Sequence, residues 1–220
     1  MMTTFEIPFK MNTAGYIIAV DVPHDVFMQE YAEDFCEWID GTVIKMSPVH
    51  DRHDMITRYL AILLETYFAY RPLGVIRQQP FVMHYEFEQE DGQKKRRDRE
   101  PDIMVILNDN LANLKETYMD GAADIVIEVV SPESVARDYS EKLYEYERIG
   151  VAEYWIIDPM KKACRFYHLN PQQAFVLQPV EDNYYSPALP GLVLNIPTLW
   201  QAILPNPPAI VKAVQAMLGE

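Results

Sequence analysis

A glutamate stands inside a stretch that otherwise predicts a fully buried strand. The stretch Asp124-Ile-Val-Ile-Glu128-Val-Val130 is nearly all Ile and Val apart from its acids, which is typical of a strand covered on both faces. A carboxylate in such a place costs several kcal/mol unless it is paired, protonated or bound to a metal ion. Glu128 is therefore either part of a structural salt bridge or an acid that takes part in chemistry.

A second carboxylate, Asp102, follows Pro101 and opens a short apolar strand that ends at Leu107. Taken alone, an aspartate at the start of a strand is often structural. Adjacent strands, however, can bring Asp102 and Glu128 to one end of a sheet. Two carboxylates there would form an oxygen-rich site suited to Mg²⁺ or Mn²⁺.

Lys142 is the third residue with a chemical interpretation. Residues 134–149 predict an amphipathic helix that ends at Gly150, a favourable C′ residue. Lys142 lies on or beside its apolar stripe, whereas the expected outward stripe consists of Asp138, Glu141, Glu145 and Arg148. One alternative is a lysine that snorkels at the edge of the stripe. The other is a lysine that reaches the sheet end holding Glu128, where it could orient an attacking water or stabilise charge on a phosphate.

The rest of the chain supplies elements that could position these residues. The Asp40-Gly41 pair predicts a hairpin between 35–39 and 42–46, because both turn residues must tolerate positive φ. Strand, helix and strand over 124–157 predict a βαβ unit. The remaining elements expected are a strand at 16–20, helices at 26–32, 51–69, 197–203 and 205–220, a strand or strand pair at 75–88, an exposed loop at 90–100, and an edge hairpin at 164–169 and 174–179. The fold class is mixed α/β, with a central mixed sheet flanked by helices and with N-terminal and edge β-hairpins.

Composition excludes several classes of protein. With 49% hydrophobic and 24% charged residues in 220, the chain is neither disordered nor a coiled coil nor collagen-like. No apolar run approaches the roughly 18 residues of a membrane helix, and the first ten residues do not resemble a signal peptide. Two cysteines, Cys36 and Cys164, favour a reducing compartment, so we expect a cytoplasmic protein. The absence of GxGxxG, P-loop, GxSxG and HExxH motifs argues against a nucleotide cofactor, a serine hydrolase and a zinc protease.

The charge balance argues against a nucleic-acid partner. There are 33 acidic and 19 basic residues, a net charge of −14, which repels DNA at long range. The one dense basic cluster, immediately before Asp102, consists of Lys94, Lys95, Arg96, Arg97 and Arg99. It is either a solvated hairpin tip or a surface that contacts phosphates and feeds DNA toward the site.

Several segments together resemble the Uma-type restriction endonucleases, a domain-of-unknown-function family of the PD-(D/E)XK nuclease superfamily. The matching segments are Glu100-Pro101-Asp102, Asp124 to Pro132, Glu141 to Tyr146, Gly150 to Pro159, Glu37 to Gly41, and Met46-Ser47-Pro48 leading to His53. The resemblance covers roughly residues 25–200, and 128–159 is its most specific part.

The resemblance implies a restriction-endonuclease-like core, a divalent metal ion (Mg²⁺ or Mn²⁺) and hydrolysis of phosphodiester bonds in DNA. Asp102 matches the aspartate of the motif and Glu128 its acidic residue. The superfamily lysine is normally two residues after that acid, where this chain has Val130, and Lys142 resembles a migrated equivalent. Thr42 also departs from the family, in which an acidic residue commonly follows the Asp-Gly turn.

Two further residues match family positions near the site. Glu37 is expected to be an additional metal-shell carboxylate, and the alternative is a half-exposed structural glutamate. His53 is expected to contact phosphate or water, and the alternative is a satisfied histidine on the helix at 51–69.

The leading hypothesis is thus a metal-dependent DNA endonuclease. The missing strand lysine and the acidic charge favour one alternative, a catalytically silent nuclease-fold module for interaction or DNA binding. A second alternative is a metal-dependent hydrolase of RNA or another phosphodiester. We expect an N-terminal extension at 1–24, a nuclease-like domain at 25–204 and a C-terminal helical arm at 205–220. That arm is expected to pack on the domain or to form a homodimer.

Overall fold

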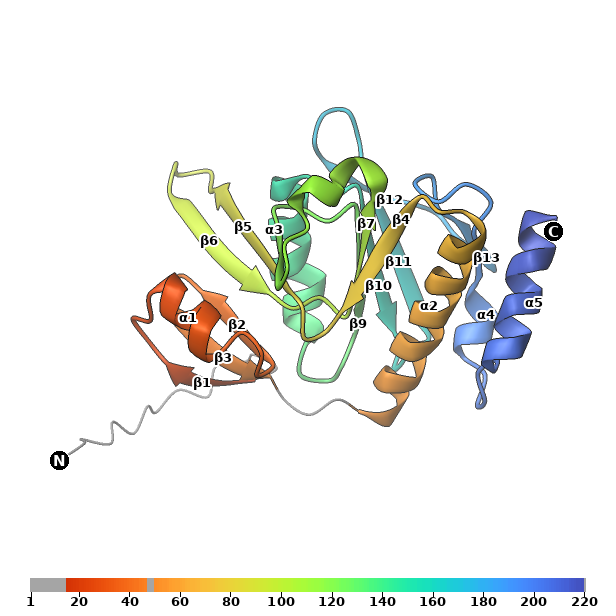
Figure 1. The fold of residues 1–220 in the computed structure, drawn as a ribbon, viewed down its shortest axis with the longest axis horizontal. Coiled ribbons are helices and arrows are strands. Elements are labelled where there is room, and N and C mark those ends of the chain that lie inside the picture. The colour runs from red at the N-terminus through yellow and green to blue at the C-terminus, as the bar shows by residue number, and fades with distance from the viewer. Residues whose placement is uncertain (1–14, 47–49, 220) are drawn as a thin grey trace.

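The structure is a computed structural model that describes residues 15–46 and 50–219. Residues 1–14 of the expected N-terminal extension, the N-terminus examined for a signal peptide, and Ser47-Pro48 of the family resemblance lie outside the described residues. Within the described part, two six-stranded mixed sheets dominate the fold, and helices lie between and beside them (Figure 1).

The first sheet has the strand order β1-β3-β2-β6-β5-β8 and the second has the order β12-β11-β10-β9-β7-β4. The strands of the first sheet are β1 (Gly15–Ala19), β3 (Thr42–Met46), β2 (Cys36–Ile39), β6 (Lys94–Arg99), β5 (Val82–Glu88) and β8 (Tyr118–Asp120). Those of the second are β12 (Phe175–Leu177), β11 (Ala163–Leu169), β10 (Glu153–Asp158), β9 (Ile125–Val129), β7 (Ile103–Leu107) and β4 (Gly74–Gln78), and β13 (Asn183–Tyr185) and β14 (Val193–Asn195) form a separate pair.

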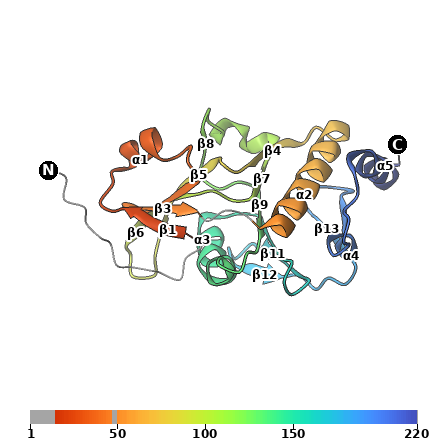
Figure 2. The ribbon, with the colours of Figure 1, turned by 90° about the horizontal axis from the view of Figure 1, so that it is seen from below.

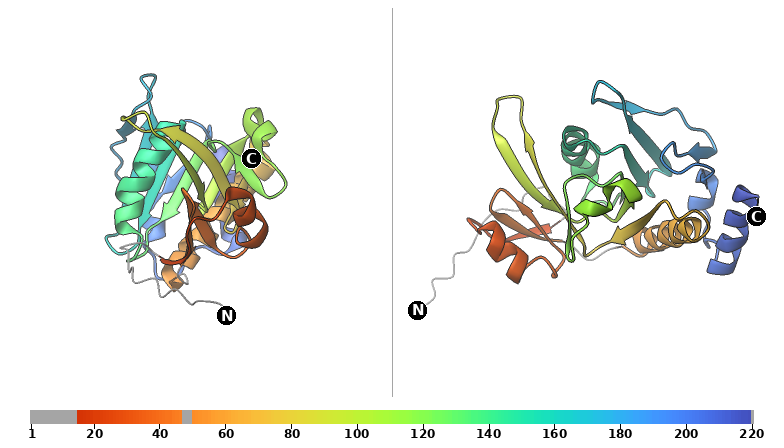
Figure 3. Two further views of the ribbon diagram at one scale, coloured as in Figure 1. Left: turned by 90° about the vertical axis from the view of Figure 1, so that its left-hand side faces the viewer. Right: turned by 45° about the horizontal axis from the view of Figure 1, so that its top comes forward.

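The helices are α1 (His24–Glu30), α2 (Asp51–Tyr70), α3 (Lys142–Ile149), α4 (Ile196–Leu199) and α5 (Pro207–Leu218), with a 3-10 turn at Asn108–Asn113 and a π-helical turn at Arg137–Glu141. Figure 2 shows, from below, α2 on one face of the second sheet and α3 on the other, whereas α1 packs on the first sheet. The β5–β6 hairpin projects away from the second sheet, and α3 lies between that hairpin and the sheet (Figure 3).

Strand β9 is buried on both faces because two separate cores meet on it. Ile125, Ile127 and Val129 belong to the core under α2, whereas Val126 belongs to the core that also contains Tyr146 of α3. β9 pairs in parallel with β10 and antiparallel with β7. The fully buried strand and the βαβ unit predicted from the sequence are both found, and Glu128, by alternation, lies on the α3 face.

The mixed α/β fold class expected from the sequence is confirmed. The Asp40-Gly41 turn joins β2 and β3, and its residues have φ values of +46° and +93°. Helix α5 packs on α2, and its Ile210 and Val214 enter the main core, which is the packing alternative for the C-terminal arm. The homodimer and the three-part division of the chain remain predictions. Within 15–46 and 50–219, no helix is long and apolar enough to cross a membrane.

The prediction of an exposed loop at 90–100 is wrong. Lys94–Arg99 forms β6, which pairs antiparallel with β5 along its length and with β2 at Arg97 and Asp98. A strand made only of charged residues has no hydrophobic alternation, so the period that identifies a strand is absent. Its inward side chains are instead neutralised by acids, as in the pair between Arg97 and Glu145.

The prediction that one stripe of the helix at 134–149 faces solvent is also wrong in part. Asp138 and Glu145 are 1% and 5% exposed. The π-helical turn at Arg137–Glu141 changes the helical period, and the first sheet covers a side of α3 that one amphipathic stripe would leave in water.

The core under α2 makes a stability prediction. Leu60 of α2 is 0% exposed, so Leu60→Ala should lower the free energy of unfolding by about 2–5 kcal/mol. Leu177→Ala is the matched control, because Leu177 on the edge strand β12 is 49% exposed and should cost less than about 1 kcal/mol. Urea denaturation followed by circular dichroism measures both, and equal losses for the two variants would contradict the packing described here.

Candidate active site

Asp102 and Glu128 face each other because of the register between β7 and β9. Ile103 pairs with Ile127, so the next pair outward sets Asp102 opposite Glu128. Both side chains are buried, at 4% and 3% exposure. The structure therefore brings together the two carboxylates that the sequence singled out, at the end of adjacent strands.

One oxygen of Asp102 is held by the protein and the other is not. Oδ2 accepts a hydrogen bond from the backbone N–H of Val129 at 2.6 Å and lies 3.1 Å from Nε2 of His53 on α2. Within the described residues, no hydrogen bond engages Oδ1. Burial alone would lower the pKa of His53, but the charge and hydrogen bond of Asp102 outweigh it and raise that pKa. His53 thus anchors Asp102.

Glu128 is arranged in the same way. Its Oε1 accepts hydrogen bonds from Nζ of Lys142 at 2.7 Å and from the hydroxyl of Tyr146 at 2.9 Å. No hydrogen bond engages Oε2 among the described residues. Burial is the main cause that raises the pKa of Glu128 to about 8; the charges of Asp138 and Asp102 add to the rise, and Lys142 opposes it.

Lys142 is the first residue of α3, is 1% exposed, and lies among three carboxylates. Besides its bond to Glu128, its Nζ is 3.6 Å from Oε1 of Glu37 and 3.7 Å from Oδ1 of Asp138. Burial would lower the pKa of Lys142, but these three acids outweigh burial and raise it. The lysine is therefore charged and points at Glu128, rather than snorkelling to solvent.

Glu37 enters the site from β2 and is held by Arg99. Its Oε2 accepts a hydrogen bond from Nη1 of Arg99 at 2.8 Å, and the same guanidinium bonds Glu145 at 3.0 Å. Burial would raise the pKa of Glu37, but Arg99, Arg137 and Lys142 lower it well below its usual range. Glu37 is thus fully buried, not half-exposed, and joins the first sheet to the site.

The structure adds two acids that sequence reasoning did not assign to the site. Glu100 is 1% exposed, and burial together with the charge of Glu37 raises its pKa to about 8, partly offset by the nearby amide of Cys36. Asp138 accepts a hydrogen bond from the hydroxyl of Ser134, and burial raises its pKa. The available signals were that Glu100 stands two residues before Asp102 and that Asp138 precedes Lys142 by one helical turn.

The cluster fits a hard divalent cation. Its buried acids are Glu37, Glu100, Asp102, Glu128, Asp138 and Glu145, and its buried cations are Arg97, Arg99, Arg137 and Lys142. Glu37 Oε1, Asp138 Oδ1 and both oxygens of Glu100 are buried without a hydrogen bond of normal geometry. An excess of desolvated carboxylate oxygens is what Mg²⁺ or Mn²⁺ binds, so the donor set suits either ion.

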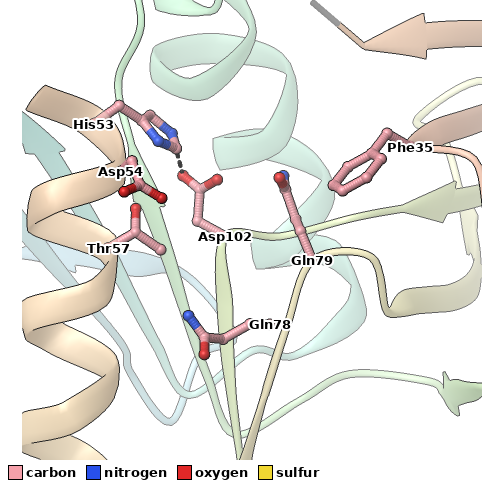
Figure 4. Close-up of a pocket in the computed structure, with 7 residues that line it drawn as sticks. All are labelled: Phe35, His53, Asp54, Thr57, Gln78, Gln79 and Asp102. Carbon is pink, nitrogen blue, oxygen red and sulfur yellow. Dashed lines mark hydrogen bonds and ion pairs between the residues drawn. The ribbon is translucent and has the colours of Figure 1, made fainter. Parts of the chain in front are cut away.

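A cavity of about 240 Å³ gives access to this cluster at Asp102. Figure 4 shows His53 and Asp102 on one side of it and Phe35 and Gln79 on the other. Its lining residues are Phe35, His53, Asp54, Thr57, Gln78, Gln79 and Asp102. Nδ1 of His53 is buried and has no hydrogen-bond partner within the described residues.

The basic cluster is divided between the surface and the interior. Arg97 and Arg99 are 8% and 1% exposed and are paired with Glu145. Lys94 and Arg96 are exposed and Lys95 is half-buried on the projecting hairpin. Of the cluster expected to contact phosphate, only these three residues are accessible to solvent, and of them Lys95 is 3.6 Å from Asp40 and Arg96 is paired with Glu86.

The raised pKa values predict how stability depends on pH. Glu100 and Glu128 titrate near pH 8 in the folded protein and near their ordinary 4.5 when unfolded. Between those values the folded state binds more protons, so the free energy of unfolding decreases as pH rises.

We expect the melting temperature of the metal-free protein to fall between about pH 5 and pH 8. The fall should be smaller in Glu128→Gln and unchanged in Glu65→Gln, whose side chain is exposed on α2. Excess Mg²⁺ should also make the decrease in melting temperature with pH smaller, because the ion binds the ionised carboxylates. Thermal melts in buffers of matched ionic strength test this, and identical slopes in wild type and Glu128→Gln would refute it.

Comparison with known proteins identifies the family of this chain. The model of the Uma2 family, described as "Putative restriction endonuclease", matches residues 25–197. The fold resembles a crystal structure described as "a putative nuclease belonging to DUF820" from Anabaena variabilis ATCC 29413, with a TM-score of 0.63 and 19% identity over 80% of this chain and 96% of that chain. A search of the curated proteins finds no match. Because the family model covers most of the chain, the protein belongs to the Uma2 family.

Proposed function

We propose that the protein is a divalent-metal-dependent endonuclease that hydrolyses phosphodiester bonds in DNA. The observation that carries the proposal is the shared arrangement of Asp102 and Glu128. Each has one oxygen fixed by the protein and one oxygen without a hydrogen bond, and the charged Lys142 lies 2.7 Å from Glu128. Two oriented carboxylates can hold the ion that assists phosphodiester hydrolysis, and a lysine beside them can stabilise the charge that develops on the phosphate.

In this proposal Asp102 and Glu128 hold Mg²⁺ or Mn²⁺ through their unbonded oxygens. An ion held there would polarise the scissile phosphate and lower the pKa of a bound water. Lys142 positions the attacking water or offsets the charge that develops on the phosphate. His53 keeps Asp102 in place through its hydrogen bond at 3.1 Å.

Glu37 takes a positioning role in the proposal, instead of the metal-shell role expected from the sequence. Its Oε2 is bonded to Arg99, and its Oε1 is 3.6 Å from Nζ of Lys142. Glu37 therefore helps to keep the lysine charged and directed at Glu128. Lys142 would in this way fulfil the function of the lysine that Val130 replaces on the strand.

DNA is the proposed substrate because of the family and of the projecting β5–β6 hairpin. Lys94, Lys95 and Arg96 lie on that hairpin, and β6 continues toward Glu100 and Asp102. The whole chain carries a net charge of −14, so attraction to the phosphate backbone is confined to a small region.

A silent nuclease-fold module is the second candidate, and one observation favours it. Lys142 already neutralises Glu128, so the site can persist without an ion. The two functions differ in their metal binding and their chemistry, which the following variants separate.

We expect Asp102→Asn and Glu128→Gln each to abolish Mn²⁺ binding and the nicking of supercoiled plasmid. Calorimetric titration measures binding, and gel electrophoresis measures cleavage. Glu65→Gln, an exposed acid on α2, should behave like the wild type in both. Wild-type protein that neither binds Mn²⁺ nor cuts plasmid would favour the silent module, and a parallel assay on an RNA transcript tests the alternative substrate.

Lys142→Met should separate binding from chemistry. Removing the ammonium group leaves both carboxylates in place, so we expect Mn²⁺ affinity within a few-fold of wild type and a cleavage rate lower by about 10²–10³. Circular dichroism establishes that the variant is folded. A folded Lys142→Met protein that cleaves at the wild-type rate would remove the lysine from the mechanism.

A further inference from the structure

Two histidines and an aspartate converge on the first sheet, away from the carboxylate cluster. Asp98 lies on β6, His84 is its direct cross-strand partner on β5, and His24 is the first residue of α1. Nε2 of His24 is 3.1 Å and Nδ1 of His84 is 2.9 Å from the same oxygen, Oδ1 of Asp98. The donor atoms of these three residues lie within 4.8 Å of one another, so the three form a possible metal-binding group within the described residues.

Strand alternation separates this group from the proposed nuclease site. Arg97 and Arg99 project from β6 toward Glu145 on α3, so Asp98 between them projects from the opposite face. That face is covered by α1 and by Trp38, which pairs with Asp98 across β2 and β6. The two sites therefore share β6 but lie on its two sides.

The distances suit a tetrahedral ion. Bonds of about 2.0–2.1 Å to zinc place neighbouring tetrahedral ligands about 3.3 Å apart. The two nitrogen-to-oxygen distances, 3.1 and 2.9 Å, need only a small widening to reach that value. One carboxylate and two imidazoles are also the donors that first-row transition ions prefer over Mg²⁺.

The electrostatics of Asp98 point in the same direction. Its side chain is 0% exposed, its Oδ2 is buried without a hydrogen-bond partner, and the ion pairs formed with it in the described chain come from the two histidines. No lysine or arginine in the described residues forms an ion pair with it. A buried carboxylate held only by two imidazoles lacks a permanent positive charge, which a bound cation would supply.

We propose that His24, His84 and Asp98 bind a divalent first-row transition ion, with Zn²⁺ as the best fit. The side chains of His24 and His84 are 26% and 16% exposed, so water can complete the coordination shell. Because the ligands come from α1, β5 and β6, the ion would link helix α1 to the β5–β6 hairpin. The core there is small and consists of Val22, Phe27, Ala32, Cys36, Trp38, Val43 and Val82.

The experiment uses full-length protein carrying Asp102→Asn and Glu128→Gln, so that the proposed nuclease site contributes no metal binding. Zn²⁺ is titrated calorimetrically, and Co²⁺ serves as a spectroscopic probe of coordination. His24→Gln and His84→Gln are compared with His50→Gln, a control because His50 lies outside the group and pairs with Glu133 on the surface. His24 is partly exposed, which keeps the test valid if His84→Gln fails to fold.

We expect one Zn²⁺ per chain and the absorption of four-coordinate Co²⁺ in the background protein and in His50→Gln. His24→Gln should weaken Zn²⁺ binding by at least the roughly 10–100-fold that loss of an outer-shell partner costs a metal site. Chelation should lower the melting temperature of zinc-loaded protein and leave that of His24→Gln unchanged. Unaltered Zn²⁺ affinity in both His24→Gln and His84→Gln, or no Zn²⁺ binding in the background protein, would overturn the proposal.

Discussion

The buried hydrogen bond between the ammonium group of Lys142 and Glu128 joins helix α3 to the central sheet, and its burial imposes the arrangement around it. An ammonium group and a carboxyl group removed from water are stable only when their remaining hydrogen-bonding capacity is satisfied. Tyr146 supplies a second bond to Glu128, and Glu37 and Asp138 surround the lysine. Each of these residues then requires partners of its own, which is why charged groups extend from β9 to the far side of α3.

This requirement explains why β6, near the centre of the first sheet, consists only of charged residues. Arg99 of β6 bonds both Glu37 and Glu145, so it links β2, β6 and α3 in one network. Arg97 repeats the contact with Glu145 two residues earlier on the same face. The helix is thus fixed between the second sheet on one side and both arginines and apolar side chains of the first sheet on the other, and the proposed catalytic lysine starts that helix. A lysine supplied by a helix instead of a strand therefore depends on the sheet that covers the helix.

The sequence predicted the parts of the site that depend on local pattern. Glu128 could be recognised because it is a carboxylate in an otherwise apolar strand, and Lys142 because it lies beside the apolar stripe of a helix. The opposition of Asp102 and Glu128 followed from the expectation that their strands are neighbours. Glu100 and Glu145 could not be assigned in this way, because their burial depends on contacts between segments far apart in the chain. Strand β6 was not predicted because its six residues are all charged and show no alternation of polar and apolar residues. The acids that stabilise it lie on α3 and β2, far away in the sequence.

The most direct test of the account is the position of Mn²⁺ in a crystal of the protein, located by its anomalous scattering. The account predicts an ion bound between Asp102 and Glu128, coordinated by Oδ1 and Oε2, with Nζ of Lys142 still beside Oε1. An ion elsewhere in the cluster that leaves both of these oxygens uncoordinated would contradict it. So would a crystal saturated with Mn²⁺ in which the ion pair persists and no metal lies between the two carboxylates.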